Sequence, residues 1–325
     1  MKRTQLITTA DLLREEVDFF IHEAERLRDK RTSDLSGKIV ASLFLEPSTR
    51  TRLSFESATL RLGGHVITVA DPSTTSMKKG ETLADSIRMV EKYADLLVMR
   101  HPLSGAAAEA IRHTQKPFIN AGDGANQHPT QALLDLYTIQ RELGTIDGLT
   151  IGFVGDLKFG RTVHSLAHLL AQYNVTVVLV SPEALRMPAE YIELLKNGRA
   201  TVSETTDLIQ CLPSLDILYM TRVQKERFEH IEDYDALKGS YLLDATLVRL
   251  GKPTLRVLHP LPRIDEIAMD VDSLPQAAYF RQAENSVFMR MAILKTLAEN
   301  YYGSPTTTFS IKAEPLKSKA PHSHA

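Results

Sequence analysis

The sequence predicts an α/β protein with two doubly wound domains, each a mainly parallel sheet flanked by helices, linked by interdomain helices. Short aliphatic and β-branched runs alternate with helix-like runs along most of the chain. This alternation is typical of parallel sheets with helices on both faces. The pattern starts again at Leu149, after a helical segment. The chain has 325 residues, which is enough for about two domains.

The first half opens on a predicted helix that starts at Thr9 or Asp11, either of which can cap it, and runs to about Lys30. Four strand–helix pairs follow. Residues 71–80 form a polar loop without apolar periodicity, and such a loop inside a compact domain suggests a functional or interface segment. The strands are predicted at 39–45, 65–70, 96–99 and 117–120, and the helices at 52–62, 83–93, 106–113 and 130–143.

The second half repeats the alternation and closes with a long helix. Its strands are predicted at 151–154, 175–180, 202, 217–220, 241–244 and 256–258, and its helices at 161–173, 189–196, 207–212 and 284–301. We assign residues 1–140 and the C-terminal helix, 284–303, to one domain, and residues 145–283 to the other. Residues 304–325 contain three prolines and many Ser, Thr, Lys and His, and we interpret them as a disordered tail.

Composition excludes several classes of function. The net charge is −2, so no overall field attracts nucleic acid or a membrane surface, and any anion site must be local. The single cysteine, Cys211, cannot form an internal disulfide and suits a reducing, cytoplasmic location. The sequence has no apolar run of membrane-spanning length, no signal peptide and no CxxC or HExxH motif. We therefore expect no membrane or nucleic-acid partner, no metal and no cofactor.

The segment Glu46–Arg52 carries the strongest local signal. It lies between a predicted strand and a predicted helix, where free backbone N–H groups and the positive end of the helix dipole attract an anion. Its three hydroxyls and the guanidinium of Arg50 are donors that suit a phosphate. The alternative is an ordinary hydroxyl cap with solvated arginines, but a cap needs only one hydroxyl. We therefore predict a phosphate site at Ser48, Thr49, Arg50 and Thr51.

Other unusual polar residues also follow predicted strands. In open α/β sheets the carboxyl ends of the strands lie at one edge, and ligands bind outside that edge. Residues that are far apart in the sequence can therefore meet in a cleft between the two domains. The positions concerned are Arg100, His128, Lys158–Arg161, Arg222–Gln224 and His259–Pro262.

Five motifs of the chain resemble the aspartate and ornithine carbamoyltransferase family. Phe44–Thr51 matches the carbamoyl-phosphate motif F-x-E-x-S-T-R-T, and His128–Gln131 matches the H-P-x-Q motif. Three further segments are similar to the aspartate type: Gly155–Ser165, Met220–Arg227 and His259–Arg263. The resemblance covers the chain except for its tail. It implies a first domain that binds carbamoyl phosphate and a second that binds the amino acid.

The residues favour aspartate over ornithine as the acceptor. Ornithine enzymes typically carry His-Cys-Leu-Pro near the C-terminus, whereas this chain has proline after His259 and its one cysteine elsewhere. Arg161 and Arg222 suit a dicarboxylate and not a cationic side chain. The resemblance therefore implies transfer of the carbamoyl group of carbamoyl phosphate to the amine of L-aspartate. The products are N-carbamoyl-L-aspartate and phosphate, in an early step of de novo pyrimidine (UMP) biosynthesis.

By this resemblance, the carbamoyl-phosphate site has three parts. The phosphate is bound by the backbone and side chains of Ser48, Thr49, Arg50 and Thr51. The carbamoyl carbonyl oxygen is polarised by Thr51, Arg100 and His128. The carbamoyl NH2 group donates to Gln131 and to the main-chain carbonyls of Leu261 and Pro262.

The same resemblance implies an aspartate site that is shared between subunits. Arg161 holds the α-carboxylate, and Arg222 with Gln224 holds the β-carboxylate. Lys79 reaches in from a neighbouring subunit as a catalytic and aspartate-binding residue, which implies a catalytic homotrimer with shared active sites. The role of Ser76 stays open, because its loop is one residue shorter than in some bacterial relatives. Also open is whether regulatory chains join a dodecamer of two catalytic trimers and three regulatory dimers.

Alternatives remain for the whole chain and for single residues. Residues 152–160 superficially resemble the Rossmann turn of a dinucleotide-linked dehydrogenase, but they lack the GxGxxG spacing. An inactive scaffold paralogue would show degenerate phosphate and arginine positions, and here all are present. An ornithine- or N-acetylornithine-type transferase is the alternative within the class. Taken alone, His128 could be a helix cap, and the arginines could be surface ion-pair partners.

Overall fold

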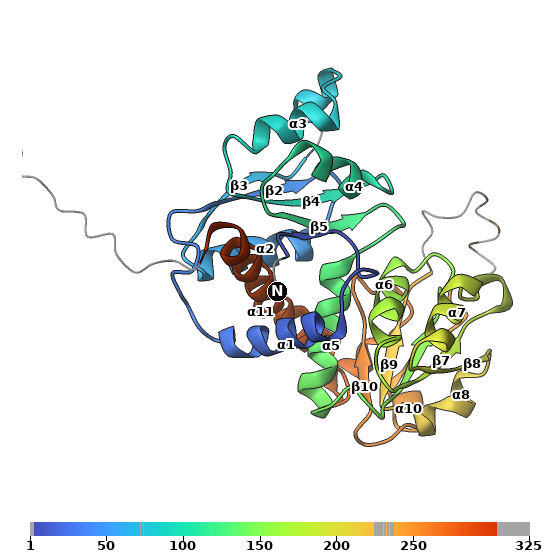
Figure 1. Ribbon diagram of the computed structural model, residues 1–325. Helices are drawn as coiled ribbons and strands as arrows, with labels where there is room; N and C mark the ends of the chain where they lie inside the picture. The colour runs from blue at the N-terminus through green and yellow to red at the C-terminus, as the bar shows by residue number, and fades with distance from the viewer. Residues whose placement is uncertain are drawn as a thin grey trace, which may run out of the picture.

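The computed structural model describes residues 3–71, 73, 75–223, 230, 232, 234 and 237–303. It confirms the predicted fold class, with two five-stranded parallel sheets that are each covered by helices (Figure 1). The first sheet has the strand order β1-β5-β4-β2-β3, and the second has the order β10-β9-β6-β7-β8. From β2 in the first sheet and from β6 in the second, the chain adds strands first on one side and then on the other, while β1 lies at the edge of the first sheet beside β5. Strand order therefore reverses between β2 and β4 and again between β6 and β9, and these are the places where such folds bind ligands.

All named strand pairs in both sheets are parallel. The first sheet consists of β1 (Gln5–Leu6), β2 (Ile39–Phe44), β3 (His65–Val69), β4 (Leu96–His101) and β5 (Phe118–Asp123). The second consists of β6 (Thr150–Val154), β7 (Thr176–Val180), β8 (Thr201–Thr205), β9 (Ile217–Met220) and β10 (Arg256–Leu258). Because parallel strands need crossover connections, helices separate most of these strands along the chain.

Alternating side chains of the strands enter two separate apolar layers. In β4, Leu96 and Val98 pack on the face that also receives Phe55, whereas Leu97 and Met99 pack on the opposite face. The period of two is the expected one for a strand, and burial on both faces explains why these strands are almost continuously apolar. Each sheet is thus the middle layer of three.

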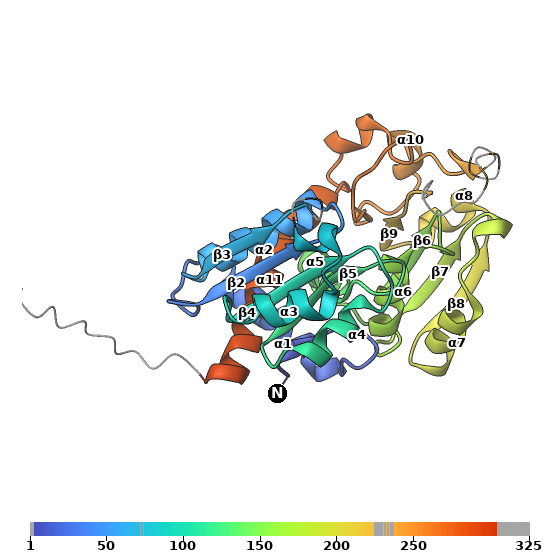
Figure 2. The same cartoon turned by 90° about the horizontal axis from the view of Figure 1, so that it is seen from above.

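The helices assemble around this framework, and Figure 2 shows them from above. The helices of the first half are α1 (Arg14–Leu27), α2 (Thr49–Arg61), α3 (Leu83–Val90), α4 (Ala106–Ala110) and α5 (Pro129–Leu143). Those of the second half are α6 (Arg161–Leu170), α7 (Ala189–Asn197), α8 (Leu208–Cys211), α10 (Ala245–Val248) and α11 (Tyr279–Tyr302). The last helix, α11, packs against α1, α2 and α5, so the end of the chain returns to its first half. The exact domain boundaries stay a prediction.

Several elements differ from the predictions, either in whether they exist or in where they start and end. The two-residue strand β1 was not predicted, because so short a segment carries no alternation. The predicted strand at 241–244 is wrong: only Leu243 forms an isolated bridge, and Asp244 caps α10 by accepting from the backbone N–H of Leu247. α11 starts at Tyr279, five positions before the predicted start. The polar loop predicted at 71–80 contains a short 3-10 helix, Ser76–Lys79.

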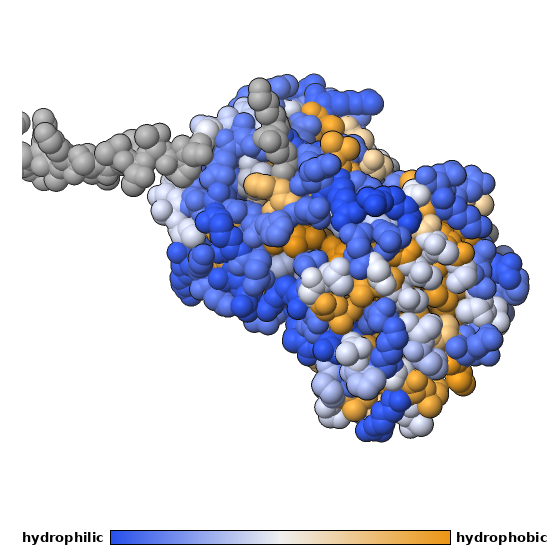
Figure 3. All heavy atoms as spheres, turned by 60° about the horizontal axis from the view of Figure 1, so that its bottom comes forward, coloured by the Kyte–Doolittle hydropathy of each residue, from blue (hydrophilic) through white to orange (hydrophobic). Residues whose placement is uncertain are grey.

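The surface is mixed in character. On the face shown in Figure 3, hydrophilic residues dominate and hydrophobic residues lie among them in groups, as is usual for folded proteins. Within the described part of the chain, no helix combines the length and apolar character needed to cross a membrane.

Candidate active site

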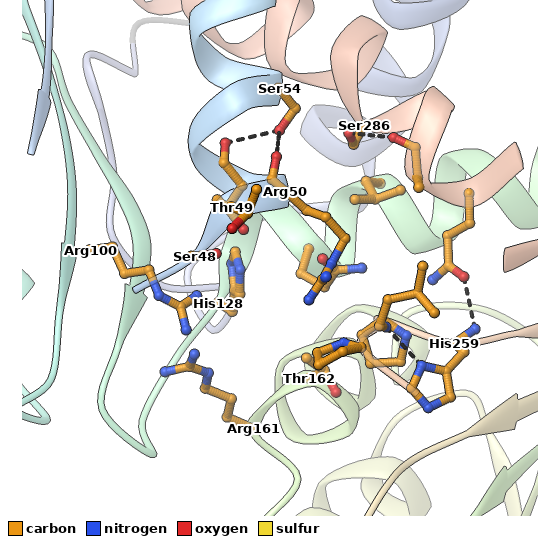
Figure 4. Close-up of a pocket in the computed structure, with 18 of the residues that line it drawn as sticks. Ser48, Thr49, Arg50, Ser54, Arg100, His128, Arg161, Thr162, His259 and Ser286 are labelled. Carbon is orange, nitrogen blue, oxygen red and sulfur yellow. Dashed lines mark hydrogen bonds between the residues drawn. The ribbon is translucent and has the colours of Figure 1, made fainter. Parts of the chain in front are cut away.

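A cavity of about 930 Å³ opens where the strand order of both sheets reverses. Its wall combines the turn before α2, the ends of β4, β9 and β10, the first turns of α5 and α6, and one side of α11. Figure 4 shows side chains from these elements pointing into a common space. Segments that are far apart in the sequence therefore meet at one site, as the positions after the strands predicted.

The turn before α2 is arranged as an anion site. Ser48 is extended, with φ −160°, and its side chain makes no capping hydrogen bond, so the ordinary capping alternative does not apply. Thr51 is buried at the cavity wall. The hydroxyl of Ser54 donates to the carbonyls of Arg50 and Thr51 at 2.7 and 2.9 Å, which fixes the first turn of the helix. The free N–H groups and hydroxyls of this turn can therefore bind a phosphate.

Glu46 joins two arginines from different halves of the chain, Arg100 at the end of β4 and Arg161 at the start of α6. Its Oε2 lies 2.8 Å from Nη2 of Arg100 and 3.5 Å from Nη2 of Arg161. Figure 4 shows the two guanidinium groups converging near His128. Burial, together with the charge of Arg161, lowers the pKa of Arg100 to about 10, and Glu46 opposes this shift. Arg100 therefore stays protonated at neutral pH.

Gly122 provides the space that these two arginines occupy. Its φ is +117°, and a Cβ at this position would come within 3.1 Å of Nη1 of Arg100 and 3.6 Å of Cζ of Arg161. Any side chain would therefore combine a strained backbone conformation with a close contact to the site. The requirement for glycine here arises from the packing of the cavity wall.

His128 lies at the start of α5 and is buried. Its side chain makes no capping hydrogen bond, so a simple capping role is not what the structure contains. Its backbone N–H donates to the hydroxyl of Ser165 at 3.0 Å. Burial, followed by the charges of Arg161 and Arg100, lowers the pKa of His128 well below its ordinary value. The imidazole is therefore neutral at neutral pH and can donate one hydrogen bond to a ligand.

Gln131 lies one turn further along α5 and also lines the cavity. Its Nε2 donates to Oδ1 of the buried Asp135 at 2.8 Å. Burial raises the pKa of Asp135 to about 7, while its hydrogen bonds and the charge of Arg290 act in the opposite direction. The amide of Gln131 is thus anchored at one end, and its other end faces the cavity.

Positive charge dominates the cavity wall. Among the described lining residues, Glu46 is the single carboxylate. The lining arginines are Arg50, Arg100, Arg161, Arg222 and Arg290. Burial, and then the nearby Arg222, lowers the pKa of Arg50. Like charges repel each other at such a site, so anionic ligands would stabilise it.

The segment after β10 closes another side of the cavity. The backbone N–H of Leu261 donates to Nδ1 of His259 at 2.7 Å. Nε2 of the same ring therefore carries the proton and donates to Glu266 at 2.6 Å. This buried pair holds the turn that contains Leu261 and Pro262, both of which line the cavity.

Most of the predicted site residues line this one cavity. They are Ser48, Thr49, Arg50, Thr51, Arg100, His128, Gln131, Arg161, Arg222, Leu261 and Pro262. Lys79 and Ser76 are exposed and do not line it, so their predicted contribution from a neighbouring subunit stays a prediction. Gln224 lies outside the described residues. The functions of all these side chains also remain predictions.

The sequence interpretation missed three buried polar residues beside the site. Arg290 and Gln282 of α11 line the cavity, and Asp135 lies behind Gln131. Nε and Nη1 of Arg290 have no hydrogen-bond partner, although the side chain is buried. The available signal was a single arginine inside the apolar run Phe288–Leu294, where a core residue would be expected. Among the described side chains, no three His, Cys, Asp or Glu residues gather where they could hold a metal ion.

The comparisons with known proteins match both halves of the chain. The model of the aspartate/ornithine carbamoyltransferase carbamoyl-P binding domain matches residues 4–141, and that of the Asp/Orn binding domain matches residues 147–297. An aspartate carbamoyltransferase catalytic subunit from Thermococcus gammatolerans is 54% identical over 294 residues, which are 89% of this chain and 96% of that protein.

Solved structures give the same result. The catalytic subunit of M. jannaschii aspartate transcarbamoylase has a TM-score of 0.86 and 49% identity, covering 93% of this chain and all of that one. Aspartate transcarbamoylase from Trypanosoma cruzi in complex with N-(phosphonacetyl)-L-aspartic acid has a TM-score of 0.85 and 44% identity. That alignment covers 90% of this chain and 95% of the other.

Proposed function

The chain belongs to the aspartate/ornithine carbamoyltransferase family, and we propose that its cavity transfers the carbamoyl group of carbamoyl phosphate to the amine of L-aspartate. The products are N-carbamoyl-L-aspartate and phosphate, an early step of de novo pyrimidine biosynthesis. The homologous T. cruzi enzyme has been solved with carbamoyl phosphate and with carbamoyl aspartate and phosphate. The observation that carries the proposal is the convergence of five arginines and one phosphate-type turn on a single cavity.

Charge balance supports two anionic substrates. The phosphate of carbamoyl phosphate, a mixed anhydride, carries about two negative charges at neutral pH, since the second pKa of a singly substituted phosphate is about 6. Aspartate adds two carboxylates, and an oxyanion develops during the reaction. Arginine is the side chain best suited to hold carboxylates and phosphates through paired hydrogen bonds. A cationic ornithine side chain would meet like charges at Arg161 and Arg222 instead.

Carbamoyl phosphate fits the half of the cavity formed by α2 and α5. Its phosphate lies at the turn of Ser48–Thr51, where the first N–H groups of α2 are free. Its carbonyl oxygen lies toward Thr51, Arg100 and the neutral ring of His128. These donors face the atom on which negative charge develops, and stabilising that charge accelerates the reaction.

Aspartate fits the half formed by the second sheet. Arg161, at the start of α6, binds its α-carboxylate, and Arg222, directly after β9, binds its β-carboxylate. This places the aspartate amine beside the carbamoyl carbon. Binding is ordered, because carbamoyl phosphate completes the surface against which aspartate lies.

The reaction depends on how the two substrates are oriented, and it needs no dedicated general base because the leaving phosphate can accept the amine proton. The aspartate nitrogen forms a bond to the carbamoyl carbon, and the electron pair of the carbonyl moves to oxygen. The C–O bond to phosphate then breaks as the carbonyl re-forms, and the leaving phosphate takes the electron pair and a proton from the amine. The site lowers the barrier by holding both substrates in the reactive geometry and by stabilising the oxyanion.

One assay tests the proposed function. The protein is incubated with carbamoyl phosphate and aspartate, ornithine or no acceptor, and carbamoylated product is measured colorimetrically. We expect product with aspartate alone. Product with ornithine alone would identify the other branch of the family, and no product with either would favour an inactive scaffold.

We further propose that the enzyme acts in the cytoplasm as a homotrimer with shared active sites. Lys79 supports this, because it lies on an exposed 3-10 helix outside the cavity and is free to face a neighbouring subunit. Mixing Lys79→Ala and Arg50→Ala chains should restore part of the activity that each variant lacks, because some mixed trimers contain one intact site. Absence of restored activity would contradict sharing. Sizing of the same protein, with and without candidate regulatory chains, tests the assembly.

A further inference from the structure

Asp135 connects three parts of the molecule from a fully buried position on α5. Its Oδ1 accepts hydrogen bonds from Nε2 of Gln131 at 2.8 Å and from Nε2 of Gln282 at 2.7 Å. Its Oδ2 accepts from the hydroxyl of Tyr219 on β9 at 2.8 Å. One carboxylate therefore joins α5, α11 and the second sheet. Three donors around it satisfy a charge that would otherwise be costly to bury.

These hydrogen bonds determine which end of the Gln131 amide faces the cavity. The backbone N–H of His259 donates to Oε1 of Gln282 at 2.8 Å, so the amide nitrogen of Gln282 must face Asp135. Oδ1 of Asp135 is consequently an acceptor, and it receives the nitrogen of Gln131 as well. The oxygen of Gln131 then points away from Asp135, and none of the described residues donates a hydrogen bond to it.

Resting on the proposed function, we propose that Asp135 is a positioning residue that sets the specificity for the acyl group. It holds Gln131 so that an acceptor, and never a donor, faces the group bonded to the carbonyl carbon of the substrate. The NH2 of carbamoyl phosphate can donate to that oxygen. The methyl group of acetyl phosphate cannot, and it would leave the oxygen of Gln131 without a hydrogen-bond partner.

The selectivity requires a hydrogen-bond acceptor at position 135 as well as the glutamine. Gln131 is one helical turn from Asp135, which is the spacing at which two side chains on a helix meet. Without an acceptor at position 135, the amide of Gln131 could rotate and turn its own NH2 group toward the substrate. Two NH2 groups would then face each other, and the preference for the carbamoyl group would fall.

The test measures the ratio of kcat/KM for carbamoyl phosphate to that for acetyl phosphate, with aspartate as acceptor. Asp135→Leu and Asp135→Val both remove the acceptor, with side chains of different size, and we expect the ratio to fall about tenfold or more in each folded variant. Asp135→Asn keeps an amide oxygen that can accept from both glutamines, so it should restore the ratio. An unchanged ratio in folded Asp135→Leu or Asp135→Val would overturn the proposal.

Two further variants separate positioning from general stability. Thr138→Val removes a buried hydroxyl, to which Asn285 donates at 3.1 Å, from the same α5–α11 contact. It should lower Tm and leave the substrate ratio unchanged. Gln131→Leu should lower the ratio, and adding Asp135→Leu to it should lower the ratio no further, because Asp135 acts through Gln131. Additive effects of these two changes would contradict the proposal.

A measurement on the wild-type protein remains informative if no Asp135 variant folds. The side-chain amides of glutamine are labelled with ¹⁵N, and the Gln131 signal is identified by its loss in Gln131→Leu. Its NH2 protons should exchange with solvent more slowly than those of exposed glutamines before any ligand is added, because the group donates a hydrogen bond to Asp135. Exchange as fast as that of an exposed glutamine would overturn the proposal. This result does not depend on turnover, so it is separate from the test of the proposed function.

Discussion

The arginines at the two ends of the cavity differ in whether a carboxylate of the protein neutralises them. Arg100 and Arg161 share the carboxylate of Glu46, at 2.8 and 3.5 Å, so an anion that belongs to the protein already occupies that end. Arg50, at the other end, forms no hydrogen bond or ion pair through its side chain within the described part of the chain, and its pKa is lowered by burial and by Arg222. An entering anion therefore meets a competing carboxylate at one end and an unneutralised guanidinium at the other.

This difference suggests how the site selects its first ligand. Arg50 is partly desolvated and lies near a second guanidinium, so an anion that binds there removes an unfavourable interaction as well as adding a favourable one. At the Glu46 end, an anionic ligand must replace the ion pairs that Glu46 already forms with Arg100 and Arg161. Its binding free energy there is therefore only the difference between its own contacts and those ion pairs. The phosphate of carbamoyl phosphate should therefore bind first at the Arg50 end, and the other end should rearrange afterwards.

Arg50→Ala is the strongest test of the unneutralised end. If this guanidinium binds the phosphate and stabilises the developing charge, its removal should lower kcat/KM about 100- to 1,000-fold while the protein stays folded. Arg52→Ala is the matched control, because Arg52 lies on the same helix, pairs with Glu56 at 3.5 Å and does not line the cavity. It should retain normal turnover. Near-normal turnover of Arg50→Ala would reject the phosphate role.

Arg222→Ala tests the part of the same end that belongs to the second sheet. Arg222 lies directly after β9 and within electrostatic range of Arg50. Loss of a bidentate contact should raise the KM for aspartate about 30- to 100-fold and change kcat less. Arg186→Ala, which removes an exposed arginine paired with Glu183 at 2.6 Å, serves as the control. If the aspartate dependence of Arg222→Ala equals that of the control, its assignment to the β-carboxylate is wrong.

Glu46→Gln tests the neutralised end, with a smaller expected effect. The amide keeps the size of the side chain but loses the charge that holds Arg100 and Arg161 together across the two sheets. We expect kcat/KM for aspartate to fall about tenfold, because the two arginines lose their common anchor. Glu142→Gln is the matched control: Glu142 also binds two arginines, Arg256 and Arg281, but lies outside the cavity. Equal effects of the two changes would contradict a specific role for Glu46.

The same contrast explains what the sequence could and could not predict. Ser48–Thr51, Arg100, Arg161 and Arg222 lie at the carboxyl ends of strands or in the connections that follow them, and the topology of a parallel sheet brings such positions to one edge. Their convergence on one cavity was therefore predictable from the order of strands and helices. The ion pair between Glu46 and the arginines was not, because side-chain partners across two sheets depend on how the sheets are placed.

The residues behind the cavity wall were harder to predict from the sequence. Asp135 and Arg290 lie within helices whose neighbours are mostly apolar, and the sequence offers no spacing that relates one to the other. Their importance appears only when α5 and α11 pack together and the buried polar atoms need partners. The false strand at 241–244 has a related cause. Leu243 enters the core of the second half and Tyr241 packs against that core without either residue joining the sheet, and an apolar pattern alone does not distinguish the two cases.

His128 lies between the two ends of the cavity, and the pKa of its ring can be measured in the wild-type protein. Because burial and the arginines lower its pKa below the ordinary value of 6.5, the neutral ring contributes stability above that value, and this stability is lost as the pH falls. Adding inorganic phosphate should raise the pKa of His128, since an anion offsets the neighbouring positive charges. Histidine signals followed by NMR against pH, with and without phosphate, measure this directly. His168, whose pKa is lowered by burial alone, is the internal control and should not respond. An unchanged pKa of His128 after phosphate is added would mean that the anion does not bind close enough for this ring to contact the carbamoyl group. The two ends of the cavity would then not be electrostatically coupled through His128.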